Sequence, residues 1–462
     1  MPSELSRRAF LKRASALSLS GAATPFVMNL AAMGEAAAAT AMDYKALVCV
    51  FLYGGNDYAN TLVPYDNTQY GIYQAQRPGL AYAQSALTPT ALTPSVALPN
   101  GAQYALAPEL AKLLPLFNAR NLAVLLNAGT LVQPTTKAQY QAHVSLPPKL
   151  LSHNDQQSYW QASSPEGAAS GWGGRIGDLL ESGNGTATLT CINATGNAAF
   201  LTGQAAVQYS VTPAGPIALN ARTSLQGSTA AASLLQSLIS GGGTHEFEAA
   251  LGSIGARALD LYSQVSAALG QAPVTTTVFP TAADPQSSLG AQLQLVAKLI
   301  SVSSQLGAKR QVFFVSTGRY DTHAGLVTLH PTLLTNLADA LRAFYDTTAE
   351  LGVASQVTTF TGSDFGRALT ANNDGTDHGW GSMHFVLGGA VRGGRYYGIN
   401  PTLANGGPDD IGQGRLIPTL SVDQYAATLA SWFGVSNSDL ATVVPNIGNY
   451  AGSALGTNVG FV

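Results

Sequence analysis

The stretch ALVCVFLYGGND, residues 46–57, joins an apolar run to a glycine turn that ends in an acid. The run from Ala46 to Leu52 is continuous and short, as in strands that are buried on both faces of a parallel sheet. Two glycines let the chain turn where this strand ends, and Asp57 follows directly. Binding sites of open α/β sheets form at the carboxyl ends of the strands. The stretch therefore predicts a strand and, just after it, one side of a site.

Three further apolar runs, at residues 122–126, 311–315 and 356–360, predict buried strands of the same kind. Two other segments, residues 292–306 and 330–351, carry apolar residues at three- and four-residue steps, which predicts helices. Strands that alternate with helices are typical of a parallel sheet covered on both sides. We therefore predict an α/β fold with a mostly parallel central sheet and helices on both faces.

Glycines and acids also follow two of the later strands. The segment after residues 311–315 contains Gly318-Arg319-Tyr320-Asp321-Thr322-His323, and the segment after residues 356–360 contains Gly362-Ser363-Asp364-Phe365-Gly366-Arg367. Only 10% of the residues are charged, so a random scatter would seldom place an acid behind three separate strands. These acids are expected to meet at one edge of the sheet.

The stretch SDFGRALTANNDGTDHGWGSMHF, residues 363–385, adds further polar groups. Carboxylates and imidazoles without a thiolate are ligands for a hard-to-borderline divalent cation. Asp321 and His323 share a face in extended chain, whereas the neighbours Asp377 and His378 serve either two metals or one metal and a substrate. An acid such as Asp364 can also form an Asx turn or a helix cap. The whole set together favours a functional site.

Asp374 differs from the other acids of this stretch. It follows Asn372-Asn373, a turn composition that faces water, so we expect it to be an exposed loop residue. Glycines flank Asp377-His378 and let both side chains turn toward the sheet edge.

Composition excludes several classes of protein. The net charge is −3, and no run of Lys or Arg lies beyond the N-terminal segment, so nothing indicates a nucleic-acid partner. No later apolar segment is long enough to span a membrane. Cys49 and Cys191 are the two cysteines. They could pair in an oxidising compartment, but the apolar run around Cys49 favours free, buried thiols.

The N-terminus reads as an export signal. Ser6-Arg7-Arg8-Ala9-Phe10-Leu11-Lys12 is a twin-arginine motif, followed by a mostly apolar stretch and Ala-rich candidate cleavage sites near Ala39 and Ala41. A membrane anchor is disfavoured because the stretch is short and interrupted by polar residues. Residues 1–41 are therefore predicted to be a signal peptide, read by the twin-arginine translocase, that takes the protein to the periplasm or beyond. Residues 42–462 are predicted to be one domain with surface insertions near 82–101 and 183–243.

A series of ordered motifs runs through the chain after the N-terminal segment. They are Gly54-Gly55-Asn56-Asp57, Ser152-His153-Asn154-Asp155-Gln156-Gln157 with Trp160, Asp321-Thr322-His323, Asp364-Phe365-Gly366-Arg367, Gly375-Thr376-Asp377-His378-Gly379, Leu387-Gly388-Gly389 with Val391, Gly393-Gly394 and Tyr397-Gly398. Together these motifs resemble the DUF1501 family over nearly all of the mature chain, and that family is similar to a branch of the alkaline phosphatase and sulfatase superfamily. The fold is accordingly expected to be alkaline phosphatase-like.

The resemblance implies a set of metal ligands. It makes Asp57 the first-strand ligand and His384 the last histidine, and Asp364 lies within one of the matching motifs. One or two divalent ions (zinc, calcium, magnesium or manganese) are expected. The Asp-x-His spacing and the early position of His384 depart from the pattern common in phosphatases, which leaves the number of metals open. The complete candidate set is Asp57, Asp321, His323, Asp364, Asp377, His378 and His384.

The nucleophile has several candidates. Ser152 lies where superfamily order would put a metal-activated hydroxyl, with His153 beside it; the alternative is a helix cap with a packing histidine. Ser145 in Ser145-Leu146-Pro147-Pro148-Lys149 is a rival, and no Cys-x-Pro-x-Arg occurs, which excludes a cysteine-type formylglycine sulfatase. Arg367 or Arg175 is a candidate fork for a phosphate or sulfate oxyanion, although surface salt bridging is the commoner role of an arginine.

Two functions follow from these observations. The first is an exported metal-dependent hydrolase of phosphate or sulfate esters, with small molecules and extracellular carbohydrates as candidate substrates. The second is a non-catalytic secreted protein that keeps the fold and binds a partner or glycan. The retained acids and histidines favour the first, and the uncertain nucleophile favours the second.

Overall fold

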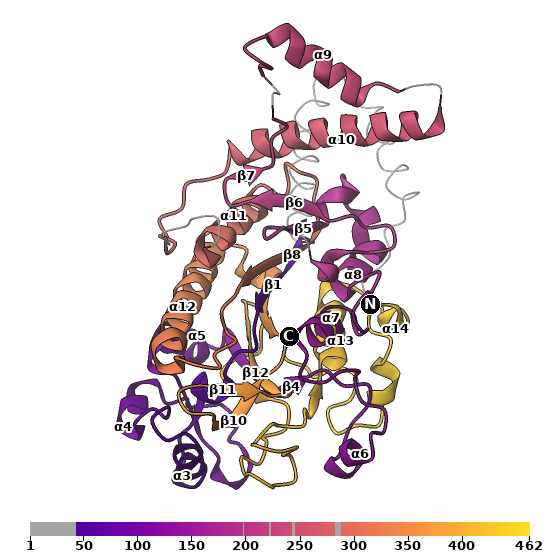
Figure 1. Cartoon of the computed structure of the whole chain (residues 1–462). Helices are drawn as coiled ribbons and strands as arrows, with labels where there is room; N and C mark the ends of the chain where they lie inside the picture. Colours follow the sequence, from indigo (N-terminus) through magenta and orange to yellow (C-terminus); the bar gives the residue numbers. More distant parts are fainter. Residues whose placement is uncertain (1–42, 197, 221–222, 243–244, 282–287) are drawn as a thin grey trace, which may run out of the picture. The chain divides into compact units, whose positions relative to one another are not determined.

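Strand β1 (Lys45–Leu52) lies in the middle of a ten-stranded sheet. The computed structural model describes residues 43–462 apart from 197, 221–222, 243–244 and 282–287 (Figure 1). The predicted signal peptide lies outside the described residues. From Lys45 to Val462 the chain forms one compact unit.

The sheet is mostly parallel, as predicted. β1 pairs in parallel with β8 (Arg310–Thr317) on one side and with β9 (Val357–Ser363) on the other. The order across the sheet is β13-β4-β12-β9-β1-β8-β5-β6-β7, and β14 also pairs with β4. Only the pairings of β12 with β4 and β9, and of β6 with β7, are antiparallel. The other bounds are β4 (Leu122–Gly129), β5 (Cys191–Asn193), β6 (Tyr209–Thr212), β7 (Gly215–Pro216), β12 (Ser382–Leu387), β13 (Tyr396–Tyr397) and β14 (Leu420–Ser421).

Helices cover both faces of the sheet (Figure 1), which confirms the predicted layers. One face carries α11 (Leu289–Ser301) and α12 (Leu326–Glu350), which pack on each other. The other face carries the helices α7 (His153–Ala162), α8 (Trp172–Leu180), α13 (Val422–Phe433) and α14 (Leu440–Val443). No helix of the described residues is both long and apolar enough to cross a membrane.

The four predicted strands and two predicted helices are all present, with ends that differ by a few residues. Shorter helices surround them: α3 (Asn67–Gln76), α4 (Gln84–Leu87), α5 (Leu114–Asn118) and α6 (Lys137–Gln141). Two small antiparallel sheets pair β2 (Leu62–Pro64) with β3 (Tyr104–Leu106) and β10 (Arg367–Ala371) with β11 (Thr376–His378).

Residues 183–243 differ from the expected surface insertion. They contain β5 and β6, which extend the central sheet beyond β8. β5 is only three residues long, which is too short for its apolar pattern to stand out in the sequence.

Alternate residues of β1 belong to a large hydrophobic cluster on one face of the sheet. Leu47, Cys49 and Phe51 face the α7–α8–α13 side, where they belong to the same buried cluster as Trp160 and Trp172. Cys49 and Cys191 are both buried free thiols, as predicted. Burial raises the pKa of both thiols, that of Cys191 to about 12, so neither is reactive near neutral pH.

The strand register explains why the polar loops meet. Leu52, the last residue of β1, lies opposite Thr317 of β8 and Ser363 of β9. The three strands therefore end at the same level, and the loops that follow them leave the sheet side by side. This confirms the inference that the acids behind these strands gather at one edge.

Candidate metal centre

Four segments supply the side chains at this edge. The loop after β8 carries Asp321 and His323, and the first residue of α7 is His153. β10 begins at Arg367 and β11 ends at His378, which lie opposite each other in the hairpin. The fold thus brings together residues that are up to 225 positions apart, from His153 to His378.

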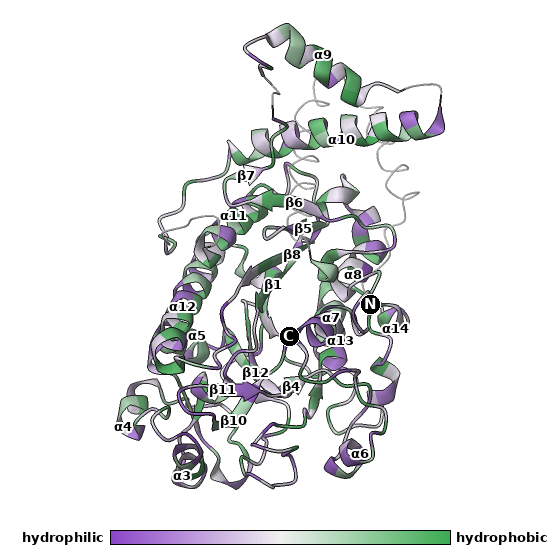
Figure 2. Cartoon of the chain, in the orientation of Figure 1, coloured by the Kyte–Doolittle hydropathy of each residue, from purple (hydrophilic) through white to green (hydrophobic). Residues whose placement is uncertain are grey.

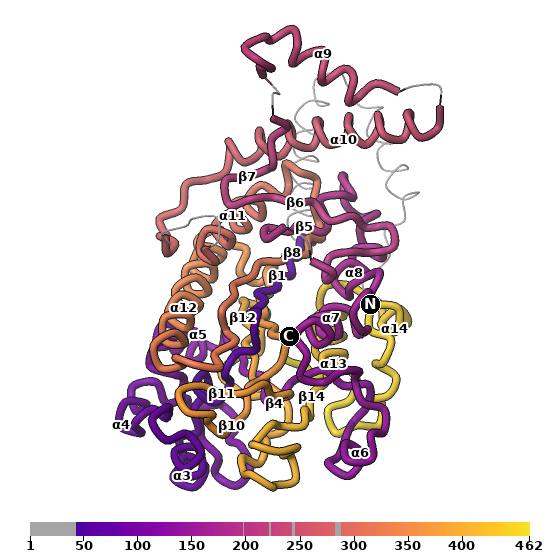
Figure 3. The backbone as a smooth tube through the Cα atoms, viewed as in Figure 1, coloured from indigo at the N-terminus to yellow at the C-terminus, as the bar shows by residue number. Residues whose placement is uncertain are grey.

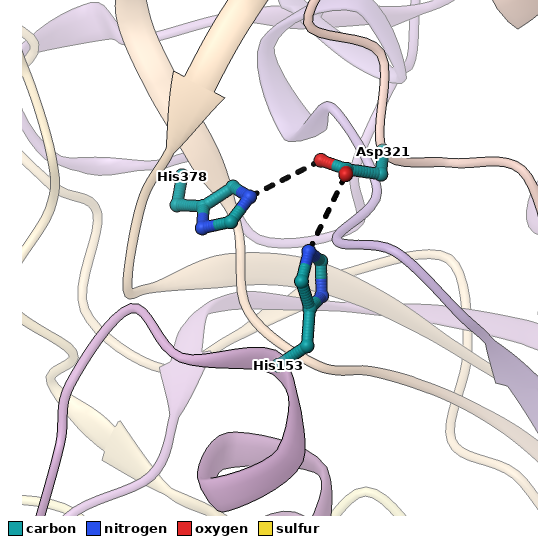
Figure 4. Close-up of side chains that lie close together, drawn as sticks. All are labelled: His153, Asp321 and His378. Atoms are coloured by element: carbon teal, nitrogen blue, oxygen red, sulfur yellow. Dashed lines mark hydrogen bonds and ion pairs between the residues drawn. The ribbon is translucent and has the colours of Figure 1, made fainter.

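Three of these side chains point toward a common centre, as Figure 4 shows. Nε2 of His153 lies 3.4 Å from Oδ2 of Asp321. Nε2 of His378 lies 3.2 Å from Oδ1 of the same carboxylate. One potential ligand atom from each of the three residues lies within 4.8 Å of the other two.

Hydrogen bonds behind the rings fix which nitrogen carries the proton. Nδ1 of His378 lies 2.8 Å from the main-chain oxygen of Leu151, and a carbonyl oxygen only accepts. Nδ1 of His153 lies 2.7 Å from Oδ2 of Asp364, a carboxylate that accepts when ionised. Both Nδ1 atoms must therefore donate, which leaves each neutral ring with a lone pair on Nε2 that faces Asp321.

The two rings differ in their affinity for a second proton. Burial lowers the pKa of His378, a shift that the hydrogen bond to Leu151 opposes and Arg367 and His153 reinforce. The hydrogen bond to Asp364 raises the pKa of His153 against the effect of its burial. His378 is thus ready to bind a cation, whereas a cation that binds His153 has to displace the proton that this ring favours.

His323 is a fourth member of the cluster. Its Nε2 lies 2.9 Å from Nε2 of His378 and 3.1 Å from Oδ1 of Asp321. Its Nδ1 lies 3.6 Å from Oδ1 of Asp377. The side chains of Asp321 and His323 are 40% and 46% exposed, so the centre opens to solvent.

The spacings fit a small divalent cation. Ligand atoms about 2.0–2.1 Å from a tetrahedral zinc ion lie about 3.3 Å from one another. His153 lies 3.4 Å from Oδ2 of Asp321, while His378 and His323 lie 3.2 and 3.1 Å from Oδ1 and 2.9 Å from each other. His153, Asp321 and His378 are the set in which one ligand atom of each residue lies within 4.8 Å of the others. Nitrogen-rich sets of this kind suit borderline metals better than calcium or magnesium, which prefer oxygen.

Arg367 supports Asp321 from behind. Its Nη1 lies 2.5 Å from Oδ1 of Asp321 and 3.3 Å from the Gly54 oxygen, and its other nitrogens contact the oxygens of Thr376. Burial alone would raise the pKa of Asp321, but the hydrogen bond and charge of Arg367, with His323 and His153, lower it overall. Arg367 is fully buried and has these protein partners. It therefore orients Asp321, and its guanidinium is not available to bind a substrate oxyanion.

Two predicted ligands, Asp364 and Asp377, lie outside the cluster and contact the histidine rings that belong to it. Asp364 is buried, and its Oδ2 accepts from His153 and from Gln157 Nε2 at 2.7 Å each. Its Oδ1 has no hydrogen-bond partner among the described residues. Asp377 accepts from Asn372 Nδ2 at 2.5 Å and lies beside the ring of His323. Both acids hold histidine rings, the arrangement common behind metal ligands.

Asp57 lies apart from the centre in a buried ion pair. Its two oxygens lie 2.5 and 2.7 Å from the two Nη atoms of Arg77, and both side chains are 0% exposed. Arg77 also donates to the main-chain oxygens of Ala368 and Leu369 in β10. In this structure the carboxylate is committed to Arg77, so it ties the loop after β1 to the hairpin that carries Arg367.

His384 and Asp374 also lie outside the cluster. His384 is buried on β12 with ring centroids of Trp160 and Tyr425 at 6.0 and 6.2 Å. Burial lowers its pKa to about 3, so the ring is neutral. Asp374 is exposed, as expected, and its Oδ2 accepts from the main-chain nitrogen of Gly325 at 2.9 Å.

Ser152 lies just before His153 at the start of α7. Its hydroxyl donates to Oδ2 of Asp155 at 2.9 Å, so it is turned toward its own helix. Arg175 donates to the main-chain oxygens of Ala162, Ser170 and Val443, and thereby ties backbone segments together. The rival Ser145 has a left-handed backbone with φ 49°.

Two groups at the centre were not predicted from the sequence. The main-chain oxygen of Leu151 orients His378, and a left-handed backbone, with φ 71°, presents it. Arg415 donates from Nε to the oxygen of His378 at 2.7 Å, and its Nη2 lies 3.9 Å from Asp377. An unusual backbone angle leaves no sequence signal at a leucine, and Arg415 lies in a long loop without a motif.

Comparison with known proteins gives a family and distant structural likenesses. The model of a family described as "Protein of unknown function (DUF1501)" matches residues 44–443. The PsFucS1 sulfatase from Pseudoalteromonas sp. is 10% identical, with 88% of this chain and 72% of that chain covered and a TM-score of 0.36. Ps i-CgsB, solved with k-i-k-neocarrahexaose, is 9% identical, with 86% and 74% covered and a TM-score of 0.35. No curated protein matches the sequence.

Proposed function

We propose that this chain, which belongs to the DUF1501 family, is an exported, metal-dependent hydrolase of phosphate or sulfate esters. One observation carries the proposal. The Nε2 atoms of His153 and His378, whose Nδ1 atoms are both committed to acceptors, converge with Asp321 on one point at the carboxyl edge of the sheet. A cluster of lone pairs that face one another is stable when a cation lies among them.

His153, Asp321, His323 and His378 would hold the cation. A bound divalent ion supplies Lewis acidity, which offsets the charge that develops on ester oxygens and lowers the pKa of a hydroxyl that reaches it. Asp364 and Leu151 keep the imidazoles in the binding tautomer. Arg367 keeps Asp321 ionised and in place.

The exposure of the centre supports a substrate in which the ester group is part of a large molecule. Asp321 and His323 are the most exposed members of the cluster, so a substrate can approach without the whole molecule entering a cavity. A glycan that bears sulfate or phosphate groups meets this condition, and a small ester meets it too. Export by the twin-arginine route would place the enzyme where extracellular glycans occur.

Ser152 is the candidate nucleophile in this proposal. It precedes His153 directly, and its hydroxyl already has a proton acceptor in Asp155 at 2.9 Å. Attack on the ester would require this hydroxyl to turn from Asp155 toward the centre. Ser152→Ala tests this role, since it removes the hydroxyl while the four histidine and aspartate ligands remain.

A second function is favoured by the same hydrogen bond. Because Ser152 is turned toward Asp155, the described cluster would bind a metal without presenting a hydroxyl nucleophile. A secreted protein that uses the metal to bind a glycan or a partner would have such a centre.

Activity with defined esters separates the two functions. The purified chain, stripped of metal and then reloaded with zinc or manganese, is assayed against aryl phosphates, aryl sulfates and sulfated oligosaccharides. The hydrolase proposal predicts turnover that requires the added metal and is lost in His378→Ala. Tight metal binding without turnover of any of these esters would favour the binding protein instead.

A further inference from the structure

A helical hairpin beyond the β6–β7 edge of the sheet exposes an unusual amount of apolar surface. It consists of α9 (Thr229–Ser240) and α10 (Glu246–Leu269), which run side by side (Figures 1 and 3). Figure 2 shows hydrophobic colouring along both helices. Large patches of this kind mark interaction surfaces. The exposed side chains are Leu234 at 61%, Leu238 at 70%, Phe247 at 81%, Leu251 at 69% and Ile254 at 58%.

The apolar residues of α10 follow a heptad pattern. They alternate in steps of four and three, the spacing that packs one helix along another. The C-terminal members Leu261, Val265 and Ala268 are buried in the protein, whereas the N-terminal members are exposed. The exposed half of the stripe therefore lacks the helix that its spacing fits. The stripe is Phe247, Leu251, Ile254, Ala258, Leu261, Val265 and Ala268.

A cavity lies over the middle of the same stripe, at the C-terminal end of its exposed half. Its volume is about 590 Å³, and its wall includes Ile254, Ala258 and Leu261 of α10 together with Tyr209 and Ile217 from the sheet side. Phe247 lies eleven residues before Ala258, or about 16 Å along the helix. One face thus presents an exposed aromatic side chain at one end and an apolar cavity at the other.

We propose that two copies of this chain form a dimer through this face, with the two α10 helices antiparallel. A two-fold axis pairs each surface feature with its complement on the other copy. With Phe247 of one copy opposite Ala258 of the second, each phenyl ring enters the other copy's cavity. Leu251 and Ile254 then meet across the axis, and the whole exposed half of both stripes is covered.

Charges along α10 agree with this orientation. Glu246 and Glu248 lie in its first turn, and Arg257 has no ion-pair partner among the described residues of its own chain. The antiparallel alignment brings the acidic turn of one copy to the level of Arg257 of the other, which is favourable, as is the opposed direction of the two helix dipoles.

A lipid surface is a poorer fit to the same face. Helices that lie on membranes carry many Lys and Arg residues on their polar side. α9 carries no charged residue, and Arg257 is the one basic residue of α10.

Sedimentation velocity of the mature chain across the micromolar range tests the dimer. We expect dimers for the wild type, and at least a tenfold higher dissociation constant for Phe247→Glu and for Ala258→Trp, which fills the receiving cavity. Val274→Glu and Val278→Glu are matched controls, because both side chains are highly exposed, at 98% and 86%, and lie off the stripe. They should leave the dimer intact.

Several outcomes would overturn the proposal. One is a wild-type chain that stays monomeric throughout this range, whether or not it binds vesicles of anionic phospholipid. Another is a dimer that is insensitive to both Phe247→Glu and Ala258→Trp. Melting temperatures report whether the variants fold. Leu251→Glu, exposed like Phe247, serves as a third disrupting variant. The outcome is independent of metal binding and of ester hydrolysis.

Discussion

Replacing Asp57 with Asn tests whether this acid has a structural role or is a metal ligand. Asp57 and Arg77 are fully buried and share two hydrogen bonds, at 2.5 and 2.7 Å. Burial alone would raise the pKa of Asp57, but Arg77, with His330 and Arg367, lowers it overall. The carboxylate is therefore ionised at neutral pH, and Asp57→Asn leaves the guanidinium of Arg77 buried without its counterion.

The cost of this change is large for a single substitution. Removal of one partner from a buried ion pair destabilises proteins by about 3–5 kcal/mol. Unfolding entropy grows with chain length, so each kcal/mol shifts the melting temperature of a unit of this size by about 1 °C. We expect a fall of about 3–5 °C and a clear decrease in the urea midpoint. The partly exposed pair Arg342–Asp346 is the control, and Asp346→Asn should cost no more than about 0.5 kcal/mol.

The decisive readout is metal binding by the folded variant. Titration calorimetry at a temperature below both melting transitions compares zinc affinity in the wild type and in Asp57→Asn. We expect equal affinities, because Asp57 supports the hairpin and lies outside the ligand cluster. If the folded variant loses affinity by orders of magnitude while its stability is unchanged, Asp57 is a ligand and the geometry described for the centre is wrong.

Other substitutions test the surroundings of the centre and the export signal. Asp364→Asn should weaken zinc binding by about 10–100-fold in competition titrations, since the acid orients His153; unchanged affinity would contradict this role. Burial raises the pKa of Asp423 to about 6, so the folded chain retains a proton that the unfolded chain loses near pH 4, and stability falls as the pH rises through this window. As the pH rises from about 4 to 7, the free energy of unfolding of the wild type, measured with urea, should fall by up to about 3 kcal/mol relative to that of Asp423→Asn. A difference that does not change with pH would refute the raised pKa of Asp423. Replacement of Arg7 and Arg8 with Lys should leave the precursor in the cytoplasm on cell fractionation, and normal yield outside would exclude the twin-arginine route.

The sequence predicts the sheet well because its central strands are continuous apolar runs. β1 and β9 are buried along almost their whole length, and β8 is buried over residues 311–315. Such runs are recognisable without any tertiary information. The short β5 is not, since three residues carry no period. α12 begins at Leu326, before the predicted start at His330. Pro331 favours a start at His330, because prolines are common in the first turn of a helix. Here the proline lies inside the helix instead.

The sequence places the candidate site at the edge where the polar loops meet, but it does not distinguish the acids that join the cluster from those that lie outside it. Strand order brings Asp321, His323 and His378 together. Nothing in the sequence indicates that Arg77 folds back onto Asp57, because an arginine at the end of a short helix is usually exposed. The role of Leu151 depends on a backbone oxygen, which side-chain patterns cannot reveal.

Bound metal in three parallel proteins tests the central claim most directly. The wild type, His378→Ala and Asp374→Ala are purified, stripped, equilibrated with zinc and analysed for bound metal and melting temperature. The account predicts that the wild type and Asp374→Ala retain the same amount of metal, because Asp374 is an exposed loop acid whose loss costs about 0.5 kcal/mol. His378→Ala should lose metal, with affinity reduced by orders of magnitude. Equal metal content in all three proteins would contradict the metal centre, and with it the proposed hydrolase.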